Sequence, residues 1–486
     1  MNILLVTLDQ FRGDALSCAG HPAARTPNLD ALAADGVRFA RHFSQAAPCG
    51  PGRASLYTGL YQMTHRVVAN GTPLDARFDN VARVAARAGY APALFGYTDQ
   101  AFDPRAADGP DDPRLQSYEE VLPGFVDGLH MPADNPRPWL DWLAAKGFPQ
   151  ESMVGAYRSE PQRDAALSCS AFLTGKAIDW IEAQGEPWFA HVSLLRPHPP
   201  YWAAGEYSTM FGSAEAGEPS PPWPDDLHPL YARLRGNRHT AAPADPALMA
   251  RVRAQYFGMI AEVDAQLGRL FAALKTRGAW EDTFIVVTSD HGEQLGDHGL
   301  IGKGGFFEES YAIPCIVRDP RAGRARGAVV EAFTEAVDVL PTLAEAMGLA
   351  APDPCDGAAL TPFLNGDTPN AWREAAHCEF DWRESFLRGG ETGAALERHS
   401  LAVRRSQDAA YVQFADGSSL AFDLAADPGW RTTLTDPARL LAEAQAMLAW
   451  RAQHAERTLT GTLIDHGVKG RAPPAAPEMR RFPVGA

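Results

Sequence analysis

The sequence predicts an α/β protein with a doubly wound, mostly parallel central sheet flanked by helices, and with a smaller C-terminal antiparallel unit. Continuous apolar runs of strand length, at 3–8 and 283–289, are typical of strands buried on both faces. Segments with helical spacing alternate with such runs through most of the chain. Near the C-terminus the pattern changes to short alternating runs separated by turn residues, which is typical of antiparallel hairpins.

Eight segments are expected to form the central sheet and its flanking helices. The helix at 28–35, for example, begins after Thr26-Pro27 and stops before Gly36, as helix-start and helix-stop signals require. In chain order the expected series is strand 3–8, helix 28–35, helix 79–88, strand 91–97, helix 165–184, strand 188–195, the long amphipathic helix 248–274 and strand 283–289.

Two stretches, 101–155 and 205–246, interrupt this series. Both are rich in Pro, Asp, Gly and Trp and lack clean periodicity. Long irregular segments in enzymes are often lids or substrate walls, and they are also often plain surface loops. Both interpretations stay open for these two insertions.

The C-terminal part is expected to form a second, smaller unit of sheet and helix. The expected elements are strands at 400–404, 410–414 and 420–424, a turn at Asp416-Gly417 and a helix at 437–458. We therefore divide the chain into a catalytic α/β domain at 1–369, a sheet-plus-helix domain at 370–458 and an arm at 459–486. The arm is rich in Pro, Gly and Arg, and it either wraps a partner subunit or is partly disordered.

The composition is that of an ordinary globular protein with an acidic balance. The chain has 486 residues, 45% hydrophobic and 21% charged, with a formal net charge of −16. A nucleic-acid partner is not expected, because phosphate binding needs a basic surface. An anionic substrate would have to be held by local positive groups and a metal that overcome the overall field.

Cellular location is expected to be cytoplasmic, with no membrane partner. The chain opens directly into the apolar run at 3–8 without a basic leader, and that run is too short to span a membrane. The six cysteines are scattered without disulfide-like or zinc-like spacing. Five of them are expected to be plain reduced thiols, and only Cys49 has a chemical context.

Polar residues follow two of the expected buried strands. Asp9-Gln10 comes after the strand at 3–8, and Asp290-His291 comes after the strand at 283–289. In open α/β sheets, sites form outside the carboxyl ends of the strands. These side chains are therefore candidates for one shared site.

With these motifs the chain resembles the sulfatase branch of the alkaline phosphatase superfamily, and most closely the phosphonate monoester hydrolases and related bacterial arylsulfatases. The resemblance extends from Asn2 to about Leu434. It is carried by Leu8-Asp9-Gln10, Thr26-Pro27-Asn28-Leu29-Asp30, Pro48-Cys49-Gly50-Pro51-Gly52-Arg53 with its continuation to Tyr61, Arg196-Pro197-His198-Pro199, Ser289-Asp290-His291-Gly292-Glu293 with Lys303, and Phe422-Asp423-Leu424 with Asp427-Pro428.

The resemblance implies one divalent metal, held by Asp9, Gln10, Asp290, His291 and the residue at position 49. Carboxylate and amide oxygens with one imidazole suit Mn²⁺ or Ca²⁺. Many sulfatases have Asn where this chain has His291, and the nitrogen ligand favours Mn²⁺, with Ca²⁺ as the alternative.

The resemblance also implies that Cys49 is not the working residue. The string C-x-P-x-R is similar to the signal at which a formylglycine-generating enzyme oxidises cysteine to formylglycine. The hydrated aldehyde would be the metal-bound nucleophile. Arg53, one helical turn further on, would hydrogen-bond the matured residue.

Four residues are implied to contact the substrate, namely Lys303, His198, Asn70 and Tyr97. Lys303 supplies a point charge for an anionic oxygen, and His198 donates to the transferred group or protonates the leaving group. Asn70 and Tyr97 match pocket positions of phosphonate monoester hydrolases. Those hydrolases have hydroxyl residues after the tyrosine, whereas this chain has Asp99, an acid that would repel a second negative charge.

The expected activity is hydrolysis of sulfate monoesters, as in arylsulfatases, through formylglycine and one metal. The alternative is a phosphonate monoester or phosphodiester hydrolase with the same machinery, and one pocket could accept both monoanions. A two-metal phosphatase or phosphomutase would need Ser or Thr as nucleophile, and a non-catalytic relative would need a broken motif; neither fits as well. The partners expected are a small anionic ester, the maturation enzyme and further copies of the chain in a homo-oligomer, either a dimer or a tetramer.

Overall fold

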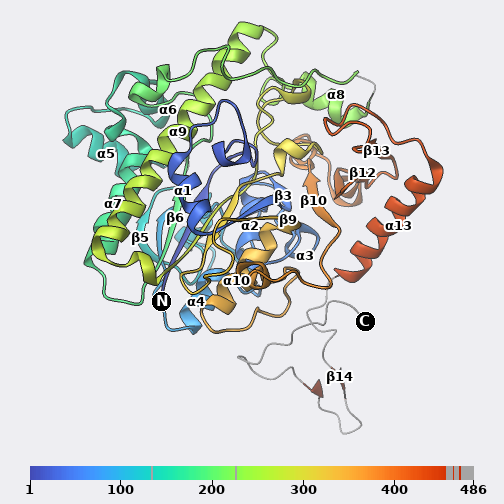
Figure 1. The fold of residues 1–486 in the computed structure, drawn as a ribbon. Coiled ribbons are helices and arrows are strands. Elements are labelled where there is room, and N and C mark those ends of the chain that lie inside the picture. Colours follow the sequence, from blue (N-terminus) through green and yellow to red (C-terminus); the bar gives the residue numbers. More distant parts are fainter. Residues whose placement is uncertain (133–134, 225–226, 456–462, 465–469, 472–486) are drawn as a thin grey trace.

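A computed structural model describes residues 1–132, 135–224, 227–455, 463–464 and 470–471, and it is built around two sheets (Figure 1). The larger sheet has eight strands. In spatial order these are β5 (Val126–His130), β4 (Ala93–Gly96), β6 (Phe189–Leu194), β1 (Asn2–Leu8), β7 (Thr283–Ser289), β8 (Cys315–Arg318), β2 (Val37–Phe43) and β9 (Ala328–Glu335). Only β8 runs antiparallel to its neighbours, so the expectation of a mostly parallel sheet is confirmed.

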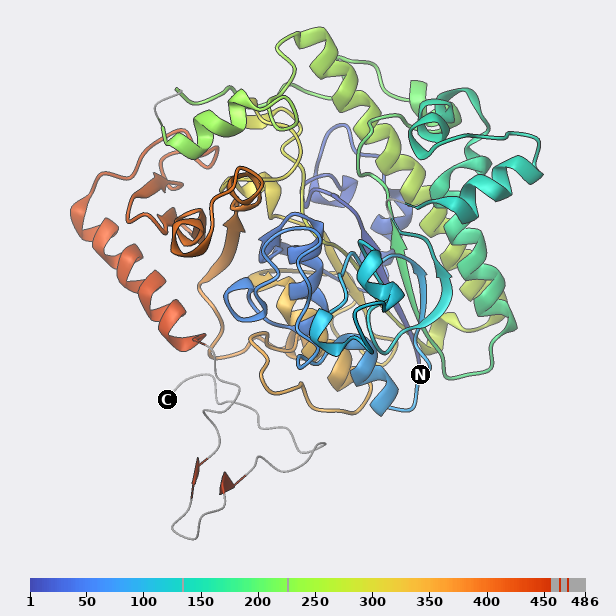
Figure 2. The ribbon, with the colours of Figure 1, turned by 180° about the vertical axis from the view of Figure 1, so that it is seen from behind.

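Helices cover both faces of this sheet, as expected for a doubly wound fold. Alternate residues of β1 point to opposite faces. Leu4 and Val6 pack against residues of α1 (Pro27–Asp35), α7 (Cys169–Ala183) and α9 (Pro246–Arg277). On the other face, Ile3 and Leu5 pack with α2 (Cys49–Thr58), α4 (Val81–Arg87) and α10 (Val339–Ala346), and Figures 1 and 2 show the two layers from opposite sides.

Most expected elements are present with shifts of a few residues at their ends. The helix expected at 165–184 begins only at Cys169, because the Ser168 side chain accepts the backbone N–H of Ala171 and caps the helix there. Residues Ala165–Leu167 form a separate 3₁₀ turn before it. The helix expected at 248–274 extends to 32 residues, and its end at Gly278 adopts the left-handed conformation typical of a helix stop.

The two insertions contain more regular structure than their sequences indicate, so the expectation of irregular segments is wrong in part. Segment 101–155 holds β5, α5 (Arg137–Ala145) and the start of α6 (Met153–Arg158), while 205–246 holds α8 (Pro229–Gly236). Strand β5 is an edge strand with three exposed residues, and for this reason it lacks the apolar run that marks a buried strand.

The second sheet has the order β13-β12-β11-β10-β3. Its strands are β13 (Ser419–Asp423), β12 (Ala409–Phe414), β11 (Ser400–Ser406), β10 (Ala375–Asp381) and β3 (Ala46–Ala47). The three expected C-terminal strands are present, and β10 is an addition. Strand β3, which comes from the N-terminal part and immediately precedes the Cys49 helix, pairs in parallel with β10.

The remaining helices are short, apart from one near the C-terminus. The short helices are α3 (Gln62–His65), α11 (Thr361–Leu364) and α12 (Glu384–Leu387). Helix α13 (Pro437–Gln453) packs on the second sheet through Met447 and Trp450 (Figure 1). The expected arm at 459–486 lies outside the described residues except for the pair β14 (Leu463–Ile464) and β15 (Gly470–Arg471). In the described part of the chain, no helix is both long and apolar enough to cross a membrane.

Candidate active site

The expected site residues converge at one edge of the larger sheet. Strands β4, β6, β1 and β7 are neighbours and run parallel, so their carboxyl ends lie side by side. Asp9 follows β1, Asp290 follows β7, and the segments that carry Tyr97 and His198 follow β4 and β6. Cys49, the first residue of α2, lies at the same edge beside Asp9 and Asp290.

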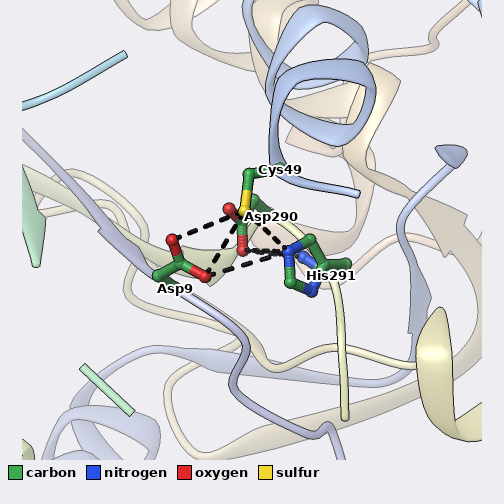
Figure 3. A group of neighbouring side chains, drawn as sticks. All are labelled: Asp9, Cys49, Asp290 and His291. Atoms are coloured by element: carbon green, nitrogen blue, oxygen red, sulfur yellow. Dashed lines mark hydrogen bonds and ion pairs between the residues drawn. The ribbon is translucent and has the colours of Figure 1, made fainter. Parts of the chain in front are cut away.

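Cys49 lies within a buried group of metal-ligating side chains (Figure 3). The ligand atoms of Asp9, Cys49, Asp290 and His291 all lie within 4.8 Å of one another. Cys49 Sγ is 3.7 Å from Asp9 Oδ2 and 3.3 Å from His291 Nε2. In the matured protein an oxygen of the hydrated formylglycine would take the place of this sulfur.

Helix α2 lies deep in the protein, and all ten of its residues are buried. A Cβ at Gly52 would lie 2.4 Å from the backbone oxygen of Asp290 and 2.9 Å from that of Ala46. Only glycine permits this approach of the helix to the end of β7. The sequence C-G-P-G-R therefore places Cys49 beside Asp290 through a contact that depends on Gly52.

Arg53 is completely buried beneath the cluster and holds both carboxylates. Its Nε donates to Asp290 Oδ2 at 2.9 Å, and its Nη2 lies 3.6 Å from Asp9 Oδ2. Nη1 donates to Ser193 Oγ at 2.7 Å. Among the described residues Nη2 has no hydrogen-bond acceptor, so it is a buried donor available to a group bound in the site. The hydrogen bond from Arg53 to the matured residue stays a prediction.

The protonation states of the cluster suit a divalent cation. Burial, and next the charge of Asp290, raises the pKa of Asp9. Burial alone would raise the pKa of Asp290 as well, but His291, Arg53 and Lys303 lower it to about 2. Burial lowers the pKa of His291 to about 4, so the imidazole is neutral at pH 7.

The tautomer of His291 also fits a metal ligand. Nδ1 lies 2.9 Å from the backbone oxygen of Gly292, which can only accept a hydrogen bond. The proton is therefore on Nδ1, and the lone pair of Nε2 faces Cys49 and the two carboxylates. Two acid side chains and one imidazole lone pair directed at a common point are the donor set that a divalent metal needs.

Gln10 and Lys303 complete the cluster on one side. Lys303 Nζ donates to Gln10 Oε1 at 2.7 Å and to Cys49 Sγ at 3.0 Å. Burial would lower the pKa of Lys303, but Cys49, Asp9 and Asp290 together raise it above its ordinary value. The lysine is thus a fixed ammonium beside the expected nucleophile.

His198 is partly exposed on the segment after β6. That segment is held by Arg196, which donates to the backbone oxygens of His198 at 2.9 Å and Pro200 at 2.8 Å, and which pairs with Glu160 at 2.5 Å. Burial, followed by the charge of Lys303, lowers the pKa of His198. The imidazole is therefore neutral and near the ammonium, although its role stays a prediction.

The two expected pocket residues differ in their surroundings. Asn70 Oδ1 accepts the backbone N–H of Gly50 at 2.9 Å, and in the described part of the chain the Asn70 NH₂ group donates no hydrogen bond. The ring of Tyr97 is buried and lies 4.0 Å from the Arg53 guanidinium carbon. Tyr97 therefore packs against Arg53, and a direct contact between Tyr97 and the substrate stays a prediction.

Three residues of this region have no role assigned from the sequence alone. Glu293 is buried and its carboxylate accepts the Gln10 side-chain amide. Asp99 is buried near Cys49, and the Tyr118 hydroxyl donates to it. Glu293 ends the motif Ser289-Asp290-His291-Gly292-Glu293 and Asp99 follows Tyr97 closely, whereas Tyr118 belongs to no motif.

The buried group of two carboxylates, one histidine and one cysteine at the carboxyl edge of an α/β sheet is a candidate metal site of a hydrolase. The model of the sulfatase family matches residues 1–349, and that of the C-terminal region of N-sulphoglucosamine sulphohydrolases matches residues 296–436. The chain belongs to the sulfatase family, and it is an ester hydrolase of that family. Family membership implies a divalent metal and a formylglycine at position 49.

Three individual relatives are similar to this chain over most of its length. The multifunctional alkaline phosphatase superfamily protein PehA of Trinickia caryophylli is 38% identical over 94% of this chain and 96% of its own. The phosphonate monoester hydrolase of Agrobacterium radiobacter is similar in structure, with a TM-score of 0.90 at 44% identity over 97% of this chain and 100% of that chain. An arylsulfatase of Clostridium perfringens is 25% identical over 89% of this chain and 90% of its own.

Proposed function

We propose that this protein hydrolyses phosphonate monoesters and sulfate monoesters in a single site, with residue 49 as the nucleophile after its conversion to formylglycine. The observation that carries the proposal is the position of Cys49, which lies 3.0 Å from the half-buried ammonium of Lys303 and 3.3 Å from the lone-pair nitrogen of His291. Both ester classes are monoanions with a tetrahedral centre, so one set of contacts serves both.

The metal would be held by Asp9, Gln10, Asp290 and His291, with Mn²⁺ favoured over Ca²⁺ because of the imidazole. When bound, the metal acts as a Lewis acid that neutralises charge on the transferred group and on the attacking oxygen. Arg53 contacts both Asp9 and Asp290 and thereby fixes the orientation of the two carboxylates. The formylglycine supplies an oxygen nucleophile whose aldehyde form can be regenerated in each turnover.

The side chains around the cluster would bind and orient the ester. The Lys303 ammonium would contact an anionic oxygen of the transferred group, and the NH₂ group of Asn70 would donate to another. His198 Nδ1 lies 2.7 Å from the backbone oxygen of Pro199, so its proton is on Nδ1 and its Nε2 accepts. Proton delivery to the leaving group would therefore require His198 to be charged in the complex.

Phosphonate monoesters are proposed as the better substrates. The supporting observation is the likeness to phosphonate monoester hydrolases, at 44% identity for the Agrobacterium radiobacter enzyme and 34% for that of Silicibacter pomeroyi, with a TM-score of 0.89 for the latter. Sulfate monoesters, which the sequence motifs favour, remain the second substrate class, and the similarity to an arylsulfatase supports them.

The test compares kcat/KM for an aryl phosphonate monoester and an aryl sulfate with the same leaving group. The enzyme is co-expressed with the formylglycine-generating enzyme, and Cys49→Ala serves as the inactive control. We expect turnover of both esters, with phosphonate preferred, and no turnover by the variant although it folds. Near-wild-type activity of Cys49→Ala would rule out the nucleophile, and a clear preference for sulfate would reverse the substrate order.

We also propose a cytoplasmic location and a homo-oligomeric state. Among the described residues Cys18, Cys49, Cys169, Cys315 and Cys378 are free thiols, which suits a reducing compartment. Maturation by a formylglycine-generating enzyme of the same cell is part of this proposal.

A further inference from the structure

Glu293 lies at the centre of a buried hydrogen-bond network beside the cluster. Its side chain is fully buried. Oε2 accepts from Gln10 Nε2 and from the Tyr201 hydroxyl at 2.9 Å, while Oε1 accepts the backbone N–H groups of Leu295 at 2.8 Å and Gly302 at 2.6 Å. With two donors on each oxygen, this carboxylate cannot turn without breaking hydrogen bonds.

The network decides which end of the Gln10 amide faces the cluster. A glutamine amide can present either its oxygen or its NH₂ group, and only the oxygen can bind a cation. A carboxylate accepts and cannot donate, so Glu293 requires that the NH₂ group of Gln10 points towards it. Oε1 then faces the other way, where it accepts from Lys303 at 2.7 Å.

The backbone of Gln10 is held just as firmly. Its φ of 68° lies in the left-handed region, which is uncommon for residues other than glycine. The backbone N–H donates to Asp290 Oδ1 at 3.1 Å, and the Tyr256 hydroxyl donates to the backbone oxygen at 2.7 Å. The direction of the side-chain amide is therefore the main freedom left to this residue.

We propose that Glu293 is a positioning residue that orients the Gln10 amide oxygen towards the metal and thereby sets the metal affinity of the site. The same carboxylate anchors Gly302, the residue before Lys303, so the metal ligand and the ammonium are held by one group. The inference rests on the divalent metal of the proposed function.

A double-mutant cycle on full-length protein tests this. Mn²⁺ is titrated calorimetrically into metal-free wild type, Gln10→Ala, Glu293→Gln and the double variant. We expect Glu293→Gln to weaken Mn²⁺ binding by about 10- to 100-fold. Because Glu293 acts through Gln10, the double variant should bind no more weakly than Gln10→Ala alone.

The matched control is Glu262→Gln. Glu262 is another buried glutamate, on α9, that accepts the Ser168 hydroxyl at 2.6 Å away from the cluster. We expect its Mn²⁺ affinity to stay within about twofold of wild type.

A second test exchanges the partners in Gln10→Glu/Glu293→Gln, where the residue-293 amide donates to residue 10 and a carboxylate oxygen still faces the cluster. This variant should fold and bind Mn²⁺ at least about tenfold more tightly than Glu293→Gln.

Three results would overturn the inference while the wild type binds Mn²⁺. These are an unchanged affinity in Glu293→Gln, losses that add in the double variant, and an exchanged pair that is no better than Glu293→Gln or does not fold. Absence of Mn²⁺ binding in matured wild type would instead refute the metal of the proposed function, and the inference with it.

Discussion

Asp99 is a buried acid in a site that would bind anions. It adopts a left-handed backbone with φ of 52°, and among the described residues its Oδ2 has no hydrogen-bond partner. Burial, and next the charge of Glu119, raises its pKa to about 7. Below this pH the carboxyl is neutral, and above it a negative charge lies near Cys49.

This titration predicts a pH dependence of substrate binding. As the pH rises through about 7, the Asp99 carboxylate should repel the anionic ester and raise KM. In Asp99→Asn the side chain stays neutral, so this rise should disappear and KM at high pH should fall about fivefold, or about 1 kcal/mol. The measurement is KM against pH for both proteins.

An identical KM profile in the two proteins would remove Asp99 from the binding site. Phosphate monoesters, which are dianions, provide a second comparison. Asp99→Asn should improve their turnover more than that of monoanionic esters, because repulsion grows with substrate charge.

The site residues that the sequence predicts are those next to a strong local signal. Asp9 and Asp290 directly follow buried apolar strands, and Cys49 stands in a distinctive string. Ser193 and Tyr118 could not be found in this way. Their contacts to Arg53 and Asp99 depend on how distant segments pack, and neither has a motif of its own.

At the scale of elements, the seating of α2 depends on one glycine. We predict that Gly52→Ala moves α2 away from β7. The new Cβ would clash with the backbone oxygens of Asp290 and Ala46, which cannot move without distorting the backbone. Turnover should fall by at least about tenfold, and the free energy of unfolding by about 1–3 kcal/mol. Activity assays and denaturant unfolding measure these two consequences, and peptide mass analysis of residue 49 checks that wild type and variant are compared at the same degree of conversion.

Gly175→Ala is the matched control. Gly175 lies within α7, and a Cβ there would meet nothing within 4 Å. Alanine should stabilise this helix by about 0.5–1 kcal/mol and leave turnover unchanged. Equal behaviour of the two variants would show that the approach of α2 to β7 does not matter.

Sequence patterns predict those strands whose residues all lie in the same environment. Strands β1 and β7 are buried throughout and appear as continuous apolar runs. Strand β2 contains Arg38, Arg41 and His42 and alternates irregularly between buried and exposed positions, so no simple period marks it. Strand β10 is buried but carries His377, Glu379 and Asp381. The partners of His377 and Glu379, which are Glu335 and Met63, lie in other parts of the chain, whereas Asp381 pairs with the nearby Arg383.

At the scale of the whole molecule, the negative charges of Asp9 and Asp290 predict how the protein responds to metal removal. Without a cation, Asp9 and Asp290 repel each other inside the core, and burial followed by this repulsion raises the pKa of Asp9. A chelator should abolish turnover, and Mn²⁺ should restore it better than Ca²⁺. Metal at about 100 times its Kd should stabilise the fold by about 2.7 kcal/mol.

The checks are activity and denaturant unfolding of metal-free protein before and after each cation is added back. Asp290→Ala should lose both the activation and the metal-dependent stabilisation, since it removes the proposed ligand and the hydrogen-bond acceptor of Arg53. Full turnover of rigorously metal-free enzyme would contradict the proposed centre.

The pairing of β3 with β10 has a consequence for the order of events during synthesis. Residues 46–47 leave the ribosome early, but their partner at 379–380 is made hundreds of residues later. Until then Ala46 and Ala47 lack their partner strand, and Cys49, which is only 5% exposed in the folded protein, lies two residues beyond them. We therefore expect a modifying enzyme to reach this thiol more easily in the unfinished chain than in the folded protein.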